Sequence, residues 1–157
     1  MKHIIQALVE NKFGVLSRVA SLFSARGYNI DSLAVGETND PTVSCMTIVV
    51  NAADERILEQ IKKQLHKLID VITVADFTRK DHLDRELILV KAAMRSEDKE
   101  TVNGLVKNYP VKLVEENNDQ IILEICAGHD ELDGIFRELE KLSVKELVRT
   151  GKIAISK

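Results

Sequence analysis

The chain runs twice through one order of segments: strand, helix, strand, strand, helix, strand. In the first half, strand-like segments alternate apolar and polar residues, and helix-like segments carry apolar residues every three or four positions. The expected strands are 4–10, 30–37, 43–51 and 71–77, and the expected helices have apolar stripes within 15–23 and 57–68. We expect Gly27 to end the first helix and Asp54 to cap the second. Such an order folds most simply into a four-stranded antiparallel sheet with both helices on one face.

A polar, charged segment at 78–85, TRKDHLDR, predicts a boundary between two domains, 1–78 and 79–157. The second half repeats the order, with Ser96 as a candidate helix cap and a break at Thr150-Gly151. Its expected strands are 86–94, 111–115, 120–127 and 146–155, and its expected helices are 96–108 and 130–142. The predicted fold class is therefore α+β, with two ferredoxin-like βαββαβ domains. These are either an old duplication or two uses of a common fold.

A sheet with helices on one face leaves its other face open. In the first strand the expected open face carries Ile4 and Leu8. In the third strand the open face carries either the set that contains Met46 and Ile48 or the set that contains Cys45. Neither set is strongly polar, and exposed apolar sheet surface is typical of an interface. We therefore expect self-association, either between sheet edges or between sheet faces.

The composition excludes several classes of function. Net charge is -3, and the longest dense basic stretch is Lys62-Lys63, so no nucleic-acid surface is expected. No apolar run approaches the roughly 20 residues of a membrane helix, and no N-terminal signal is expected. The two cysteines, Cys45 and Cys126, lie in apolar strand segments and are expected to be buried free thiols. We expect a cytoplasmic protein without membrane contact.

The segment with most chemical content joins the first strand to the first helix. Backbone N–H groups of Gly14, Val15 and Leu16 lack helical partners there and favour an anion such as an amino-acid carboxylate. Asn11 and Asn29 offer donors and acceptors suited to the two charges of a zwitterion. The alternative interpretation is purely structural, with Asn11 as a helix cap, Gly14 as a turn residue and Asn29 in an ordinary loop.

Other chemical motifs are sparse. The sequence has no phosphate-binding glycine loop, no dinucleotide motif and no paired metal-ligand spacing. A metal site through His82 or His129 is a weaker alternative to solvated histidines. Hydrolysis of acyl phosphates by Arg18 or Arg26 with Asn29 is the rival enzyme hypothesis, although both arginines fall within the predicted amphipathic helix.

Four strings carry a family resemblance: VENKFGVLSRVASLFSARGYNIDSLAVG, NDPTVSCMTIVV, LEQIKKQLHKLIDVITV and HLDRELILVK. The first resembles the ACT domain, a small-molecule-binding module of βαββαβ order. The combination of LFSARGYNIDSL, the DP turn and MTI is similar to the ACT domain that opens acetolactate synthase small subunits. The resemblance is strong over roughly 1–95 and weaker beyond. Phe13 stands where the family usually has a smaller residue or proline, and Cys45 stands where arginine is usual.

The resemblance implies that two ACT domains pair side by side and bind valine or another branched-chain amino acid between them. One chain would contribute Asn11, Gly14, Val15 and Leu16, and its partner would contribute Asn29 and Ile30. A slot for an apolar side chain separates ligands that differ by one methylene by only about 1–3 kcal/mol, so leucine and isoleucine are expected as weaker ligands.

The family's role is regulatory and non-catalytic. The resemblance implies a homodimer that activates a large catalytic subunit of acetolactate synthase and transmits feedback inhibition by valine in branched-chain amino acid biosynthesis. Thiamine diphosphate, Mg²⁺ and FAD are expected in that catalytic partner, and neither a cofactor nor a metal is expected in this chain. The alternative is a free-standing ACT-domain sensor that regulates another enzyme or transcription.

Overall fold

A computed structural model describes residues 2–51 and 55–157 and divides the chain into two compact units. The first contains the residues up to Leu83 together with 152–157, and the second is Asp84–Gly151. The division between Leu83 and Asp84 falls inside the predicted boundary segment 78–85, and strand β5 (His82–Ala93) begins within that segment. The last six residues, which the sequence division placed in the second domain, cluster with the first unit.

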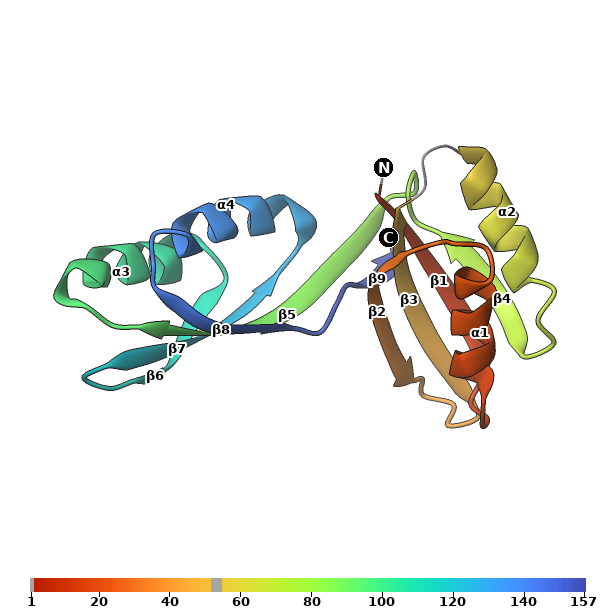
Figure 1. Ribbon diagram of the computed structural model, residues 1–157, viewed down its shortest axis with the longest axis horizontal. Coiled ribbons are helices and arrows are strands. Elements are labelled where there is room, and N and C mark those ends of the chain that lie inside the picture. The colour runs from red at the N-terminus through yellow and green to blue at the C-terminus, as the bar shows by residue number, and fades with distance from the viewer. Residues whose placement is uncertain (1, 52–54) are drawn as a thin grey trace. The chain divides into compact units, whose positions relative to one another are not determined.

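The first unit has the expected βαββαβ order (Figure 1). Its elements are β1 (Lys2–Glu10), α1 (Val15–Ser24), β2 (Ile30–Glu37), β3 (Val43–Asn51), α2 (Glu55–Leu65) and β4 (Val71–Asp76). All pairings are antiparallel, in the order β2-β3-β1-β4, so β2 and β4 are the edge strands. The expected cap Asp54 lies outside the described residues.

The core of the first unit lies between its sheet and the two helices. Alternation in β1 buries Ile5, Ala7 and Val9 on the helix side. In β3, Met46 and Ile48 occupy that side, which settles the choice that the sequence left open. The end of α1 is also as expected. Gly27 has φ 67°, and the N–H of Tyr28 returns to the carbonyl of Phe23 at 3.0 Å.

The open face of this sheet differs from its prediction. The short strand β9 (Ile153–Ser156) lies against it: Gln6 Nε2 donates to the carbonyl of Ala154 at 2.8 Å, and the N–H of Lys152 donates to Ser32 Oγ at 3.0 Å. Thr47, on the same face, is buried. The expected exposed partner surface is therefore partly covered by the chain's own C-terminal segment.

The second unit repeats the order with β5, a short 3-10 turn, and five further elements. These are α3 (Lys99–Asn108), β6 (Val111–Glu116), β7 (Gln120–Ala127), α4 (His129–Leu139) and β8 (Val144–Arg149). The strand order is β6-β7-β5-β8, and β9 also pairs with β5. Its core is a separate apolar cluster that includes Ile88, Leu105, Leu123 and Ile135.

Two expectations for the second unit are wrong. Ser96 lies inside the 3-10 turn (Ser96–Asp98), and the carboxylate of Asp98 instead accepts the N–H of Arg95 at 3.0 Å. Cys126 is exposed on the open sheet face, opposite Leu87, because its register places it away from the helices.

In the first unit, Cys45 is only half-buried, and this burial raises the pKa of its thiol. Among the described residues, no helix is long and apolar enough to cross a membrane.

Candidate functional site

The start of α1 has the backbone geometry of an anion site. Gly14 precedes the helix in the left-handed conformation, with φ 79° and ψ -3°. No side chain caps this end, and the first turn contains no acidic residue. Only a long backbone bond of 3.4 Å, from Val15 N to the carbonyl of Lys12, engages the first helical N–H. The first turn of N–H groups and the positive end of the helix dipole therefore meet no acidic side chain of the helix's own first turn.

The side chains around this loop leave the predicted anion site to its backbone. Val15 is buried in the core, so only its backbone is available to a ligand. Leu16 is 45% exposed and Phe13 is fully exposed, so neither side chain fills the corner beside Gly14. The departure at Phe13 thus leaves the loop open within a single chain.

Arg18 is a neighbour of this loop that the sequence analysis had considered only for acyl-phosphate chemistry. A Cβ placed on Gly14 would lie 3.0 Å from Arg18 Nη1. Arg18 Nε binds Asp70 Oδ2 at 2.7 Å, which fixes the guanidinium beside the loop. In the sequence, Arg18 follows Gly14 by four residues, about one helical turn, and this spacing indicates that the two lie close together.

The two asparagines are held by internal hydrogen bonds. Asn11 Nδ2 donates to Glu37 Oε1 and to the carbonyl of Pro41, both at 2.9 Å. Asn29 Nδ2 donates to Asp31 Oδ1 at 2.7 Å. These bonds occupy both amide N–H donors of Asn11 and one of the two of Asn29, and the two amide oxygens can accept hydrogen bonds from an ammonium group.

The predicted residues separate into two groups at opposite ends of β3. Asn11 lies beside the start of β3, since its N–H donates to the carbonyl of Thr42. Ile30 pairs with Val50 at the other end. The seven residue-to-residue steps of strand from Val43 to Val50 span about 23 Å. The structure therefore brings Asn11, Gly14, Val15 and Leu16 together and leaves Asn29 and Ile30 far from them in the same chain.

The rival enzyme hypothesis finds no shared site. Arg18 is engaged by Asp70, Arg26 Nη2 by Gln64 at 2.7 Å, and Asn29 by Asp31. Within the described part of the chain, no group of three His, Cys, Asp or Glu side chains is placed to hold a metal ion. His82 Nδ1 instead lies 2.7 Å from the carbonyl of Lys80.

Comparisons with known proteins cover both units. The family of AHAS small subunit-like ACT domains matches residues 5–73, and the family described as the small subunit of acetolactate synthase matches 85–157. A probable acetolactate synthase small subunit of Archaeoglobus fulgidus is 41% identical, covering 99% of this chain and 96% of its own length. The isozyme 3 small subunit of Salmonella typhimurium is 38% identical, covering 100% and 96%.

A solved structure agrees with these sequence matches. The crystal structure of an acetolactate synthase small subunit from Thermotoga maritima superposes with a TM-score of 0.88 at 33% identity. The match covers 100% of this chain and 98% of that one.

Proposed function

Because the chain belongs to the family of acetolactate synthase small subunits, we propose that it activates a large catalytic subunit and transmits feedback inhibition by valine. The acetolactate chemistry, with its thiamine diphosphate, Mg²⁺ and FAD, belongs to that catalytic subunit. This chain acts by binding an effector and biasing its partner. A coupling free energy of about 1–3 kcal/mol between the two sites changes activity or affinity about 5- to 150-fold.

The observation that carries the proposal is the separation of the two site halves along β3. β2 is an edge strand, and no strand among the described residues pairs with its outer edge. A two-fold axis through the middle of this edge would pair β2 antiparallel with its copy. It would bring Ile30 of one chain opposite Glu37 of the other. Since Asn11 is bonded to Glu37, each ligand loop would then meet Asn29 of the second chain.

The chemistry of the combined site suits a small apolar amino acid. The carboxylate would accept from the N–H groups that follow Gly14, with the Arg18 guanidinium beside it. The ammonium would donate to the amide oxygen of Asn29, and Leu16 and Ile30 would contact the side chain. Valine has few heavy atoms, so a dissociation constant between about 1 mM and 1 μM is the expected range.

A complementation experiment tests both valine binding and the two-chain site. Calorimetry on the full chain should show valine binding, and either Gly14→Asp or Asn29→Ala should weaken it strongly. In a heterodimer of the two variants, one site contains both substitutions and the other contains neither. Mixing the variants should therefore restore valine binding at half of the heterodimer sites.

Two results would contradict the proposal. If calorimetry on the unsubstituted chain shows no binding of valine, leucine or isoleucine at 10 mM, the sensor role is wrong. Binding that mixing does not restore would place the whole site within one chain. Activation is measured separately, as acetolactate formation by the large subunit with and without this chain. If this chain does not raise that activity, the proposed activation is wrong.

A further inference from the structure

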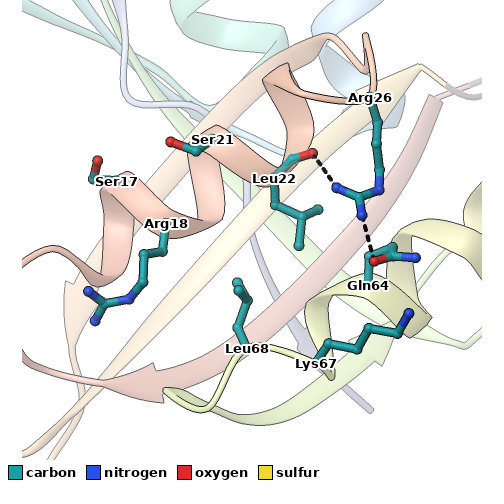
Figure 2. A pocket seen from close by; sticks show the side chains of 8 residues that line it. All are labelled: Ser17, Arg18, Ser21, Leu22, Arg26, Gln64, Lys67 and Leu68. Carbon is teal, nitrogen blue, oxygen red and sulfur yellow. Dashed lines mark hydrogen bonds between the residues drawn. The ribbon is translucent and has the colours of Figure 1, made fainter.

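A second concave surface lies on the helix side of the first unit, away from the β2 edge. A groove of about 370 Å³ runs between α1 and the end of α2 (Figure 2). Its lining residues come from both helices and from the turns that follow them: Ser17, Arg18, Ser21, Leu22, Arg26, Gln64, Lys67 and Leu68. Figure 2 shows Leu22 and Leu68 directed toward each other between the helices.

The charge in this groove is of one sign. Three lining residues are cationic, Arg18, Arg26 and Lys67, and none is acidic. This concentration occurs in a chain whose net charge is -3. Arg26 is held in place, since Nη1 donates to the carbonyl of Leu22 and Nη2 to Gln64 Oε1. Because Asp70 neutralises Arg18 in part, the strongest positive potential lies toward Arg26 and Lys67.

The arrangement favours an extended partner over a small anion. The cations are exposed and therefore well screened, so a single phosphate would gain little from any one of them. The groove floor between them is apolar. Arg18 lies six residues before Ser24, the last residue of α1, which is about 9 Å along the helix axis, and Arg26 lies in the turn just beyond. An occupant that matches this pattern has an apolar side chain between carboxylates separated by a similar distance.

We propose that the groove between α1 and α2 is the docking site for an acidic segment of the large catalytic subunit, with an apolar anchor seated between Leu22 and Leu68. This inference rests on the proposed function, which supplies the partner. Arg18 contributes to the groove and also lies beside Gly14, so docking and the ligand loop share one side chain. That shared position gives valine binding a short physical route to the docking surface.

Two exposed serines of α1 provide a matched pair of variants. Ser21 lines the groove and Ser24 does not, although both are exposed on the same helix. Ser21→Glu places a carboxylate among the partner's acidic groups, whereas Ser24→Glu makes the same change of charge elsewhere on the helix. Lys67→Glu and Lys63→Glu form a second pair, since Lys63 is exposed and outside the groove.

The measurement is the dissociation constant between each full-length variant and the immobilised large subunit, at 50 and 300 mM salt. Ser21→Glu and Lys67→Glu should weaken docking at least about tenfold at low salt, because each sets like charges against each other. Ser24→Glu and Lys63→Glu should stay within about twofold of the unsubstituted chain. Valine calorimetry on the same samples should be unchanged, which also shows that the variants are folded.

The outcomes separate this inference from the proposed function. If both members of a pair weaken docking equally, or neither does, the groove is not the docking site. Inorganic phosphate that binds the groove without competing with the large subunit would instead assign it to a small anion. Sedimentation that shows Ser21→Glu dissociating the chain's own dimer would assign it to a second copy. If the unsubstituted chain does not bind the large subunit, the activation role itself is wrong.

Discussion

The two units share one order of elements and differ in the charge of the groove between their helices. In the first unit that groove is lined by cations, Arg26 and Lys67 among them. In the second unit the corresponding groove between α3 and α4 is lined by Glu97, Glu100 and Glu138, and its lysine, Lys141, is bonded to Glu138. Of the two grooves, only the one in the first unit therefore has the charge to attract an acidic partner.

The first helices of the two units show the same contrast. The start of α1 carries no acidic side chain, whereas α3 follows Asp98 and contains Glu100 in its first turn. Because the N-terminal end of a helix is partly positive, α1 attracts an anion and α3 already supplies its own. The comparison teaches that the shared fold fixes where loops lie, and that a few charges decide which helix start favours an anion.

The largest expected effect tests the contrast between the two helix starts. Gly14→Asp should abolish measurable valine binding, a loss of more than about 100-fold, or about 2.7 kcal/mol. The backbone is left-handed there, and the new carboxylate would compete with the ligand for Arg18. Gly14→Ala is the control, because it brings the backbone strain without the charge. Equal losses in both variants would assign the effect to strain alone.

The next effect compares the ion pairs of the two units. Arg149 binds buried Glu86 through two bonds of 2.8 and 2.7 Å and lies over the ring of Phe136. Arg149→Met would strand that carboxylate and should lower the free energy of unfolding by about 2–3 kcal/mol in urea titrations. Arg18→Met removes a single hydrogen bond from Asp70, whose side chain is 10% exposed, and should cost about 1–2 kcal/mol. A larger loss of stability for Arg18→Met than for Arg149→Met would contradict the comparison.

A smaller effect concerns the two open sheet faces. β9 covers part of the first, whereas Leu89 and Val148 stay exposed on the second. Removing residues 152–157 deletes the hydrogen bonds to Gln6 and Ser32 and should destabilise the first unit by about 1–2 kcal/mol. It should also increase binding of a hydrophobic dye. Unchanged dye binding would mean that the segment does not cover the face in solution.

The smallest effect is a pH dependence in the second unit. The hydrogen bond from the Arg95 side chain lowers the pKa of Asp98. A carboxyl whose folded pKa lies below its unfolded value, about 3.9, stabilises the fold above that pH and loses this effect as the pH falls through its folded pKa. Asp98→Asn should therefore be less stable than the unsubstituted chain at pH 7. The difference, measured by urea unfolding, should shrink below about pH 3.9.

Local patterns in the sequence predicted most of the fold. Alternation in 4–10 and 43–51, and the helical spacing of Val19, Leu22 and Phe23, are properties of neighbouring residues, so they survive in the structure. The charged residues at 78–85 predicted a domain boundary, and the two units divide between Leu83 and Asp84, inside that segment. Cys126 was misplaced, since hydrophobicity does not reveal which sheet face stays open.

The candidate site divides in the same way. The loop at Gly14 could be predicted because a glycine before an apolar stripe marks a helix start whatever the rest of the chain does. The guanidinium of Arg18 beside Gly14 depends on Asp70, 52 positions later, and no local pattern contains that contact. The side-chain amide of Asn11 is likewise held by residues distant in the chain, Glu37 and Pro41.

The sequence by itself determined the two βαββαβ units and the loop at the start of the first helix, because short-range periodicity and turn chemistry specify them, and its motifs carried the family resemblance. Only the tertiary structure decided that β9 covers the first sheet, that three cations meet between α1 and α2, and that the halves of the predicted site lie at opposite ends of β3. Those facts depend on strand order and on side chains that are distant in the chain, and packing of the whole chain sets both.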